Sequence, residues 1–315
     1  MLPLLLAIVP PYIGAEACAQ CHPAQSRAHS ASRHAVALRP ANATLAALFG
    51  DRPLRERSGV EFTYEGDPRG MRVVVSRGGA SATALIEWAF GAGAQAITPV
   101  GRAGSRYFEH RISWYREPGH PARTLGHPGE ASGSPDQALG IPQDAATITR
   151  CFGCHATGVE PGPRLGNMQP GVSCERCHGP GAAHAAKPGH ANIRILSGLS
   201  ANGLVEVCAE CHRGPADKPT PGDPANIRFQ PIGLMESQCY QRSGTLSCLT
   251  CHDPHADAAT DAAFYAPKCL GCHAAPSATD CPRASRRDCV RCHMPRGTPF
   301  PFLKFTDHRI ARPGK

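Results

Sequence analysis

The chain is poor in the large residues that usually fill a protein core. Aromatic residues make up 6% of its 315 positions, and methionine occurs only five times. Glycine and proline are abundant instead, with 33 and 31 copies, which together exceed their usual share of about 12%. This composition alone predicts loops or disorder, unless a bound group supplies the missing apolar core.

A long hydrophobic run is also missing. A membrane helix takes about 20 consecutive apolar residues, and the apolar start of the chain, Met1–Pro10, has half that length. This start lacks the basic residues of a standard signal peptide. Residues 1–14 are therefore interpreted as a residual or truncated signal segment, and the sequence predicts no transmembrane segment.

Cysteine, in contrast, is frequent and regularly placed. Fourteen of the 16 cysteines belong to seven copies of the motif C-x-x-C-H. In c-type haem attachment the two thiols bond covalently to the porphyrin, and the adjacent histidine becomes an axial ligand of the iron. Seven copies predict seven covalently bound haem c groups, which would also supply the apolar core.

The predicted attachment residues follow from the motifs. The thioether cysteines are Cys18 and Cys21, Cys151 and Cys154, Cys174 and Cys177, Cys208 and Cys211, Cys248 and Cys251, Cys269 and Cys272, and Cys289 and Cys292. The proximal iron ligands are His22, His155, His178, His212, His252, His273 and His293. We refer to these as the first to the seventh motif.

Zinc is the main alternative at these cysteines. The second and third motifs form C-x2-C-x19-C-x2-C, a spacing within the range of four-cysteine zinc sites. A zinc site does not need a histidine after every second cysteine, whereas all seven motifs have one. A disulfide framework is disfavoured because the short C-x-x-C loop removes little entropy from the unfolded chain.

The formal charge of +8 describes only the apoprotein. A ferric bis-imidazole haem with two ionised propionates carries about −1, so seven would bring the total to roughly +1. The basic residues are thus interpreted as counter-charges for propionates, and the charge does not indicate a nucleic-acid partner.

Nine histidines lie outside the motifs, and they are the candidates for the distal iron ligands. With methionine scarce, bis-histidine ligation is expected, which lowers the reduction potential relative to a Met/His pair. His110 lies on a strand with alternating apolar residues, where a satisfied core histidine is an equal alternative. His190 follows Pro188-Gly189 and is either a ligand or a turn residue.

Several phrases resemble multihaem cytochromes c of the group that includes the tetrahaem carrier of hydroxylamine oxidation. Among them are C-F-G-C-H-A-T-G (151–158), G-V-S-C-E-R-C-H-G-P-G-A-A-H (171–184) and L-S-C-L-T-C-H-D-P-H (246–255). This resemblance implies distal ligation by the histidines of S-R-H-A, C-H-G-P-G-A-A-H, C-H-D-P-H and the terminal D-H. These are His34, His184, His255 and His308, and His127 in T-L-G-H is a fifth candidate.

The spacing of the motifs divides the chain. Residues 15–40 carry the first motif, with a helix expected over 24–38, and residues 41–142 contain no cysteine. Four β-like runs, at 60–64, 71–76, 83–90 and 107–115, predict a small antiparallel β insert there. Residues 143–315 are expected to form a six-haem domain. The predicted fold class is a mainly α and irregular, haem-packed cytochrome with a small antiparallel β insert.

Electron transfer through closely spaced, low-potential haems is the function that these features favour. The alternative is a multihaem oxidoreductase in which one open haem acts on a small nitrogen or sulfur compound. Redox proteins are the expected partners, an oligomer or filament is not excluded, and the periplasm or another extracytoplasmic location is expected. Cys239 and Cys281 lie outside the motifs, and in an oxidising compartment such a pair is expected to form a disulfide.

Overall fold

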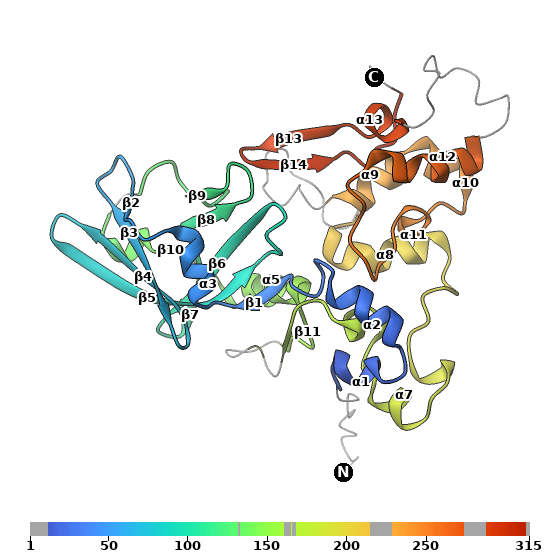
Figure 1. The fold of residues 1–315 in the computed structure, drawn as a ribbon, viewed down its shortest axis with the longest axis horizontal. Helices are drawn as coiled ribbons and strands as arrows, with labels where there is room; N and C mark the ends of the chain where they lie inside the picture. The colour runs from blue at the N-terminus through green and yellow to red at the C-terminus, as the bar shows by residue number, and fades with distance from the viewer. Residues whose placement is uncertain are drawn as a thin grey trace, which may run out of the picture.

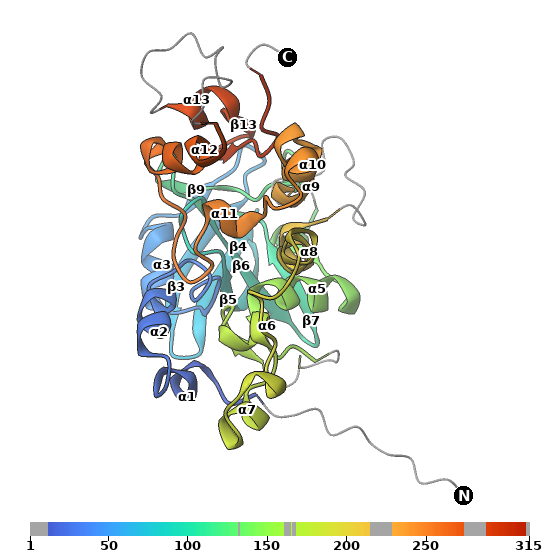
Figure 2. The same ribbon diagram turned by 90° about the vertical axis from the view of Figure 1, so that its right-hand side faces the viewer.

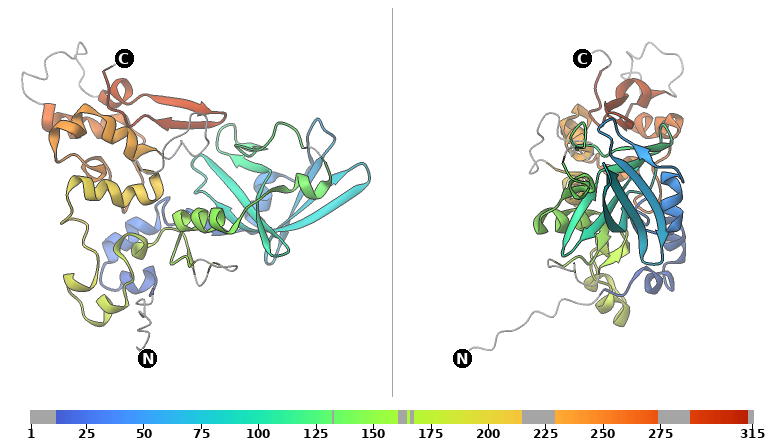
Figure 3. Two further views of the ribbon diagram at one scale, coloured as in Figure 1. Left: turned by 180° about the vertical axis from the view of Figure 1, so that it is seen from behind. Right: turned by 90° about the vertical axis from the view of Figure 1, so that its left-hand side faces the viewer.

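The computed structural model describes residues 12–131, 133–160, 165, 168–214, 229–273 and 288–312. Two lobes lie side by side (Figure 1). We call the described residues within 38–142 the sheet lobe, and the described residues within 12–37 and 143–312 the motif lobe. Seen from behind, α5 runs between the two lobes (Figure 3, left).

The sheet lobe is built around one ten-stranded antiparallel sheet. The path β10-β7-β6-β5-β4-β3-β2 forms its main order, β1 pairs with β5, and β8 joins β6 to β9. Its elements are β1 (Leu38–Pro40), α3 (Ala43–Phe49), β2 (Leu54–Arg55), β3 (Glu61–Asp67), β4 (Gly70–Arg77), β5 (Ala80–Phe90), β6 (Ala96–Ala103), β7 (Arg106–His110), β8 (Ile112–Tyr115), β9 (His120–Arg123), α4 (Pro135–Ala138) and β10 (Gly140–Pro142).

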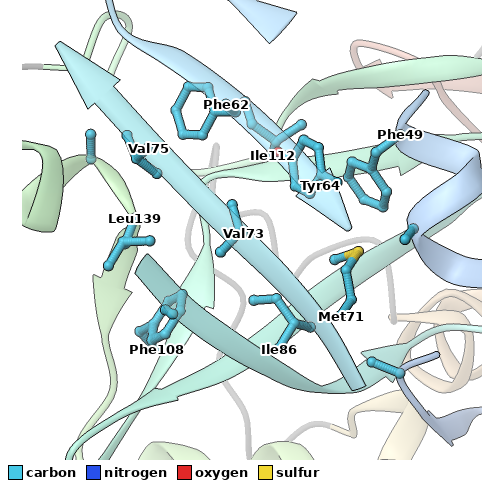
Figure 4. Packing of buried hydrophobic residues seen from close by; sticks show 14 of the residues in the cluster. Phe49, Phe62, Tyr64, Met71, Val73, Val75, Ile86, Phe108, Ile112 and Leu139 are labelled. Atoms are coloured by element: carbon cyan, nitrogen blue, oxygen red, sulfur yellow. The ribbon is translucent and has the colours of Figure 1, made fainter. Parts of the chain in front are cut away.

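The sheet forms because alternate residues of its strands are apolar and share one face. On β4, Met71, Val73 and Val75 are fully buried. They meet Phe62 and Ile86 of the neighbouring strands inside the curl of the sheet (Figure 4). The sheet lobe therefore has a side-chain core of its own.

The described part of the motif lobe consists mainly of short helices. Its elements are α1 (Ala15–Ala19), α2 (Pro23–Ser30), α5 (Ala145–His155), β11 (Ala156–Thr157), β12 (Gln169–Pro170), α6 (Cys174–His178), α7 (Ala182–Ala186), η1 (His190–Asn192), α8 (Ala201–His212), α9 (Gln230–Glu236), α10 (Gln238–Ser243), α11 (Cys248–Cys251), η4 (Ala262–Tyr265), α12 (Ala266–His273), α13 (Cys289–His293), β13 (Arg296–Phe300) and β14 (Leu303–Thr306). Five helices, α5, α6, α8, α12 and α13, end on the histidine of a motif.

The predicted fold class is wrong in its proportions. Of the described residues, 35% are helical and 26% lie in strands, and the sheet is a major part of the fold, not a small insert. One overlooked strand is β6, whose Pro99 and Gly101 resemble turn residues. Gly101 is required there, because a Cβ would lie 2.7 Å from the Leu85 carbonyl oxygen and from the Phe108 ring. The helix expected over 24–38 also differs, since α2 ends at Ser30.

A second apolar cluster joins the lobes at the second motif. Phe152, one of the two variable residues of that motif, is fully buried. Its ring lies 4.9 Å from that of Phe90, 5.6 Å from Tyr107 and 5.9 Å from Trp88, all on the sheet. The sheet thereby fixes the position of the second motif.

Replacing Phe152 by alanine is expected to lower the free energy of unfolding by about 3–5 kcal/mol, the usual cost of a buried Phe→Ala change. Urea denaturation followed by far-UV circular dichroism would measure the loss. Phe264, a residue on η4 that is 54% exposed, provides the matched control. An equal effect of the two substitutions would contradict the anchoring role of Phe152.

The hairpin β13–β14 makes a second connection between the lobes. It reaches from α13 toward β8 and β9 (Figure 1), where Phe302 packs on Tyr115 with ring centres 5.2 Å apart. Gln95 donates to the Lys304 carbonyl oxygen at 2.8 Å, and Lys304 pairs with Glu117. Among the described helices, none has the length and apolar character of a membrane span.

Candidate functional site

One large cavity gathers all seven motifs. Its volume is about 3480 Å³, and every motif cysteine and motif histidine lines it. Shared among seven motifs, this is about 500 Å³ each, within the range of about 300–1,000 Å³ typical of sites for small molecules and cofactors. Viewed from the side, the motif helices form a column from α6 to α13 (Figure 2).

Four motif histidines face a histidine from elsewhere in the chain. The ring centres are 6.4 Å apart for His22 and His184, 6.1 Å for His34 and His212, 6.4 Å for His178 and His255, and 6.3 Å for His252 and His308. The non-motif member of each pair is one of the four histidines implied by the sequence phrases.

These separations fit two imidazoles that share one metal ion. An imidazole nitrogen lies about 1.1 Å from its ring centre, and metal–nitrogen bonds are about 2.0–2.1 Å long, so the two ring centres would be about 6.3 Å apart. The four observed distances match this spacing and also fall within the range of about 4.5–7 Å for ring contacts in general. What favours a shared metal ion is that each of the four pairs contains one motif histidine.

Backbone carbonyls orient several rings among the motif histidines and the distal candidates. Nδ1 of His178 donates to the Arg194 carbonyl oxygen at 3.0 Å, and Nδ1 of His293 donates to that of Ala311 at 2.8 Å. The distal candidates His184 and His308 donate in the same way, to the carbonyl oxygens of Gly189 and Thr306. Such bonds fix the tautomer that leaves Nε2 available for a metal ion.

Burial favours the neutral form of His252 and His308, which is the form that binds metal ions. The pKa of His252 is lowered by burial and by the nearby His308, and the pKa of His308 is lowered mainly by burial. The neutral imidazole is the form that coordinates iron, so this environment favours ligation.

Cysteines of different motifs lie next to one another. A hydrogen bond with Cys248 and burial raise the pKa of Cys208, and a hydrogen bond with Cys154 and burial do the same for Cys211. Burial and the neighbouring Cys174 raise the pKa of Cys18 to about 11. These contacts bring the first motif to the third, and the fourth to both the second and the fifth.

The seventh motif adjoins the sixth in the same way. Burial, followed by the neighbouring Cys289 and Cys251, raises the pKa of Cys269 to about 11. The third motif reaches the fourth through Cys177, whose pKa is raised by burial and by Cys208. The motifs thus form a connected series from the first to the seventh, and the second motif branches from the fourth.

The other distal candidates are placed differently. His190 lines the cavity in an exposed 3-10 turn. His127 is buried in the sheet lobe, with its Nε2 atom 3.4 Å from Glu109 Oε1. Cys239 lies near the sixth motif, close to Cys272. Its predicted disulfide partner, Cys281, lies outside the described residues, so the disulfide stays a prediction.

His110 is a core residue of the sheet. Its Nδ1 atom donates to the Leu139 carbonyl oxygen at 2.6 Å, and its Nε2 atom accepts from the Tyr64 hydroxyl at 2.9 Å. Burial lowers its pKa to about 3. Both ring nitrogens are engaged by the protein, so His110 is not placed as an iron ligand. His110 fits the alternative interpretation, a core histidine whose two ring nitrogens both form hydrogen bonds.

Sequence reasoning missed the variable residues between the motif cysteines. Glu175 of the third motif contacts the segment before the first motif, Arg176 contacts the second motif, and Phe152 of the second motif packs on the sheet. Their residue types could have drawn attention to these positions, because charged and aromatic residues lie there between the two cysteines of a motif. Their contact partners could not be predicted, because those partners come from distant parts of the chain.

Comparison with known proteins gives a local family match. Residues 114–179, which contain the second and third motifs, match the family model described as cytochrome c554 and c-prime. No curated protein matches the chain.

Two solved structures are similar to the chain. The outer cell wall cytochrome OcwA is 19% identical over 64% of this chain and 37% of its own, with a TM-score of 0.37. The undecahaem cytochrome from the S-layer of Carboxydothermus ferrireducens is 18% identical over 84% of this chain and 43% of its own, with a TM-score of 0.43. The chain therefore spans less than half the length of either.

Proposed function

We propose that this chain is a multihaem cytochrome c that transfers electrons through seven covalently bound haem c groups. The observation that carries the proposal is the set of four histidine pairs, each spaced at 6.1–6.4 Å and each containing one motif histidine. The seven intact motifs on one cavity and the local match to the cytochrome c554 and c-prime family support it.

The pairs suggest an assignment of ligands. His184, His34, His255 and His308 serve as distal ligands for the first, fourth, third and fifth motifs, whose histidines they face. The haem supplies iron that alternates between the ferric and ferrous states. The protein supplies two neutral imidazoles, which favour a low potential relative to Met/His ligation.

The route of electrons follows from the adjacent attachment sites. Cysteine contacts link the first motif to the third, the third to the fourth, the fourth to the fifth, and onward to the sixth and seventh. The fourth motif also meets the second through Cys211 and Cys154. We propose a continuous path with a branch at the fourth motif, serving redox partner proteins on the extracytoplasmic side, where haem is attached to cysteine.

Intact mass spectrometry of the purified protein is expected to show the polypeptide plus seven haems, because all seven motifs keep both cysteines and the histidine. A pyridine haemochrome assay would count the haems independently. Replacing both cysteines of the seventh motif, Cys289 and Cys292, by alanine should remove one haem and leave six. Recovery of zinc in place of stoichiometric iron would end this proposal.

A further inference from the structure

The third motif, C-E-R-C-H, places two opposite charges between neighbouring motifs. Glu175 and Arg176 are consecutive residues on α6, yet they contact different parts of the lobe. Glu175 contacts the segment that leads into the first motif, and Arg176 contacts the second and fourth motifs. The burial and the hydrogen-bond partners of each side chain determine how strongly its charge acts on the neighbouring motifs.

Glu175 is a buried carboxylate, with 3% of the residue exposed. Its Oε1 atom accepts from the backbone N–H groups of Ile13 at 3.0 Å and Gly181 at 2.7 Å, and its Oε2 atom accepts from that of Gly14 at 2.8 Å. All three partners are donors, which suits an ionised carboxylate. Gly14 is the N-cap residue of α1, the helix that carries Cys18 of the first motif, so the negative charge lies at the start of that helix.

Arg176 is a partly buried cation that contacts the second and fourth motifs. Its Nε atom donates to the Gly153 carbonyl oxygen of the second motif at 3.0 Å, and its guanidinium lies 2.7 Å from Glu210 Oε2 and 3.5 Å from Cys211 Sγ of the fourth motif. Arg194 also pairs with Glu210, at 3.5 Å. Glu210 is therefore shared between two guanidinium groups, so it does not fully neutralise Arg176.

Reduction adds one negative charge to a haem, so a nearby anion opposes it and a nearby cation favours it. Charges that are buried or partly buried are screened less than exposed ones and act more strongly on their neighbours. Resting on the proposed function, we propose that Glu175 lowers the reduction potential of the haem at the first motif, and that Arg176 raises the potentials of the haems at the second and fourth motifs.

Electrons then accumulate on the haems of highest potential, those at the second and fourth motifs, where the path branches. The haem at the first motif becomes an electron donor to the haem at the fourth, by way of the third motif, which carries both charges. The dipeptide Glu175-Arg176 thus gives this part of the path a direction that the haems and their histidine ligands alone do not provide.

Spectroelectrochemical titration of the holoprotein tests this with two neutral variants. Glu175→Gln should move part of the titration curve to higher potential, and Arg176→Gln should move part of it to lower potential. Two exposed charges provide matched controls: Glu16, two residues before Cys18, and Arg291, which holds the same place in the seventh motif as Arg176 in the third. Glu16→Gln and Arg291→Gln should leave the curve in place.

Charge-conserving variants separate the electrostatic role from a structural one. Glu175→Asp and Arg176→Lys keep the charges while altering the hydrogen bonds, so they should keep the parent potentials. Neutral variants that carry seven haems and titrate like the parent protein would overturn the inference and leave the proposed function intact. A parent protein without stoichiometric haem would instead overturn the proposed function. If Glu175→Gln does not fold, the downward shift in Arg176→Gln remains decisive.

Discussion

Replacing His255 by alanine is expected to convert one haem per chain from the low-spin to the high-spin state. The His255 ring lies 6.4 Å from that of His178 and is nearly parallel to it, with an interplanar angle of 6°. Its Nδ1 atom is 3.2 Å from Asp253 Oδ1, a partner that leaves Nε2 as the nitrogen that could bind an iron. Alanine supplies no nitrogen, so one iron would lose its sixth ligand.

Electron paramagnetic resonance of the oxidised variant should show a new high-spin ferric signal. The reduced variant should bind one carbon monoxide per chain beyond the small amount expected for the parent protein. His120→Ala is the control, since His120 is exposed at the start of β9 in the sheet lobe. A His255→Ala protein that stays fully low-spin would remove His255 from the ligand set and weaken the whole assignment of pairs.

The seven motifs could be recognised from sequence because each is local, and haem attachment at them stays a prediction. Each motif carries both cysteines and the histidine within five residues, so no distant contact is needed to recognise it. The pairing of histidines is different in kind. His34 meets His212 across 178 positions of the chain, and only the family resemblance of S-R-H-A singled out His34 beforehand.

The sheet was underestimated for the same physical reason. Strand β6 has weak local signals, because it contains Pro99 and Gly101, yet it pairs with β5, β7 and β8. Its stability comes from those neighbours and not from its own propensities. His110 shows the converse, since its alternation pattern predicted an inward side chain correctly. The partners that occupy its nitrogens, Tyr64 and Leu139, come from other segments.

His110 should also make the sheet lobe sensitive to acid. Its pKa of about 3 in the folded protein lies below the unfolded value of 6.5, mainly because burial disfavours the charged ring. Between these two values the unfolded chain binds the additional proton, so stability falls as the pH falls below 6.5. Each tenfold difference in proton affinity between the two states corresponds to about 1.4 kcal/mol, which gives a loss of about 3 kcal/mol at pH 4 and at most about 5 kcal/mol at lower pH.

The substitution His110→Gln removes this titration while keeping a polar side chain in the core. The parent protein should lose stability between pH 7 and pH 4 more steeply than the variant, by about 3 kcal/mol in the free energy of unfolding. Urea denaturation followed by far-UV circular dichroism at several pH values would show it, with exposed His120→Gln as the control. If the free energy of unfolding depends on pH in the same way in the parent and His110→Gln proteins, His110 is protonated as readily in the folded protein as in the unfolded chain. The hydrogen bond from Nδ1 to the Leu139 carbonyl would then be preserved in the imidazolium, and the Tyr64 hydroxyl would have to turn its oxygen toward Nε2.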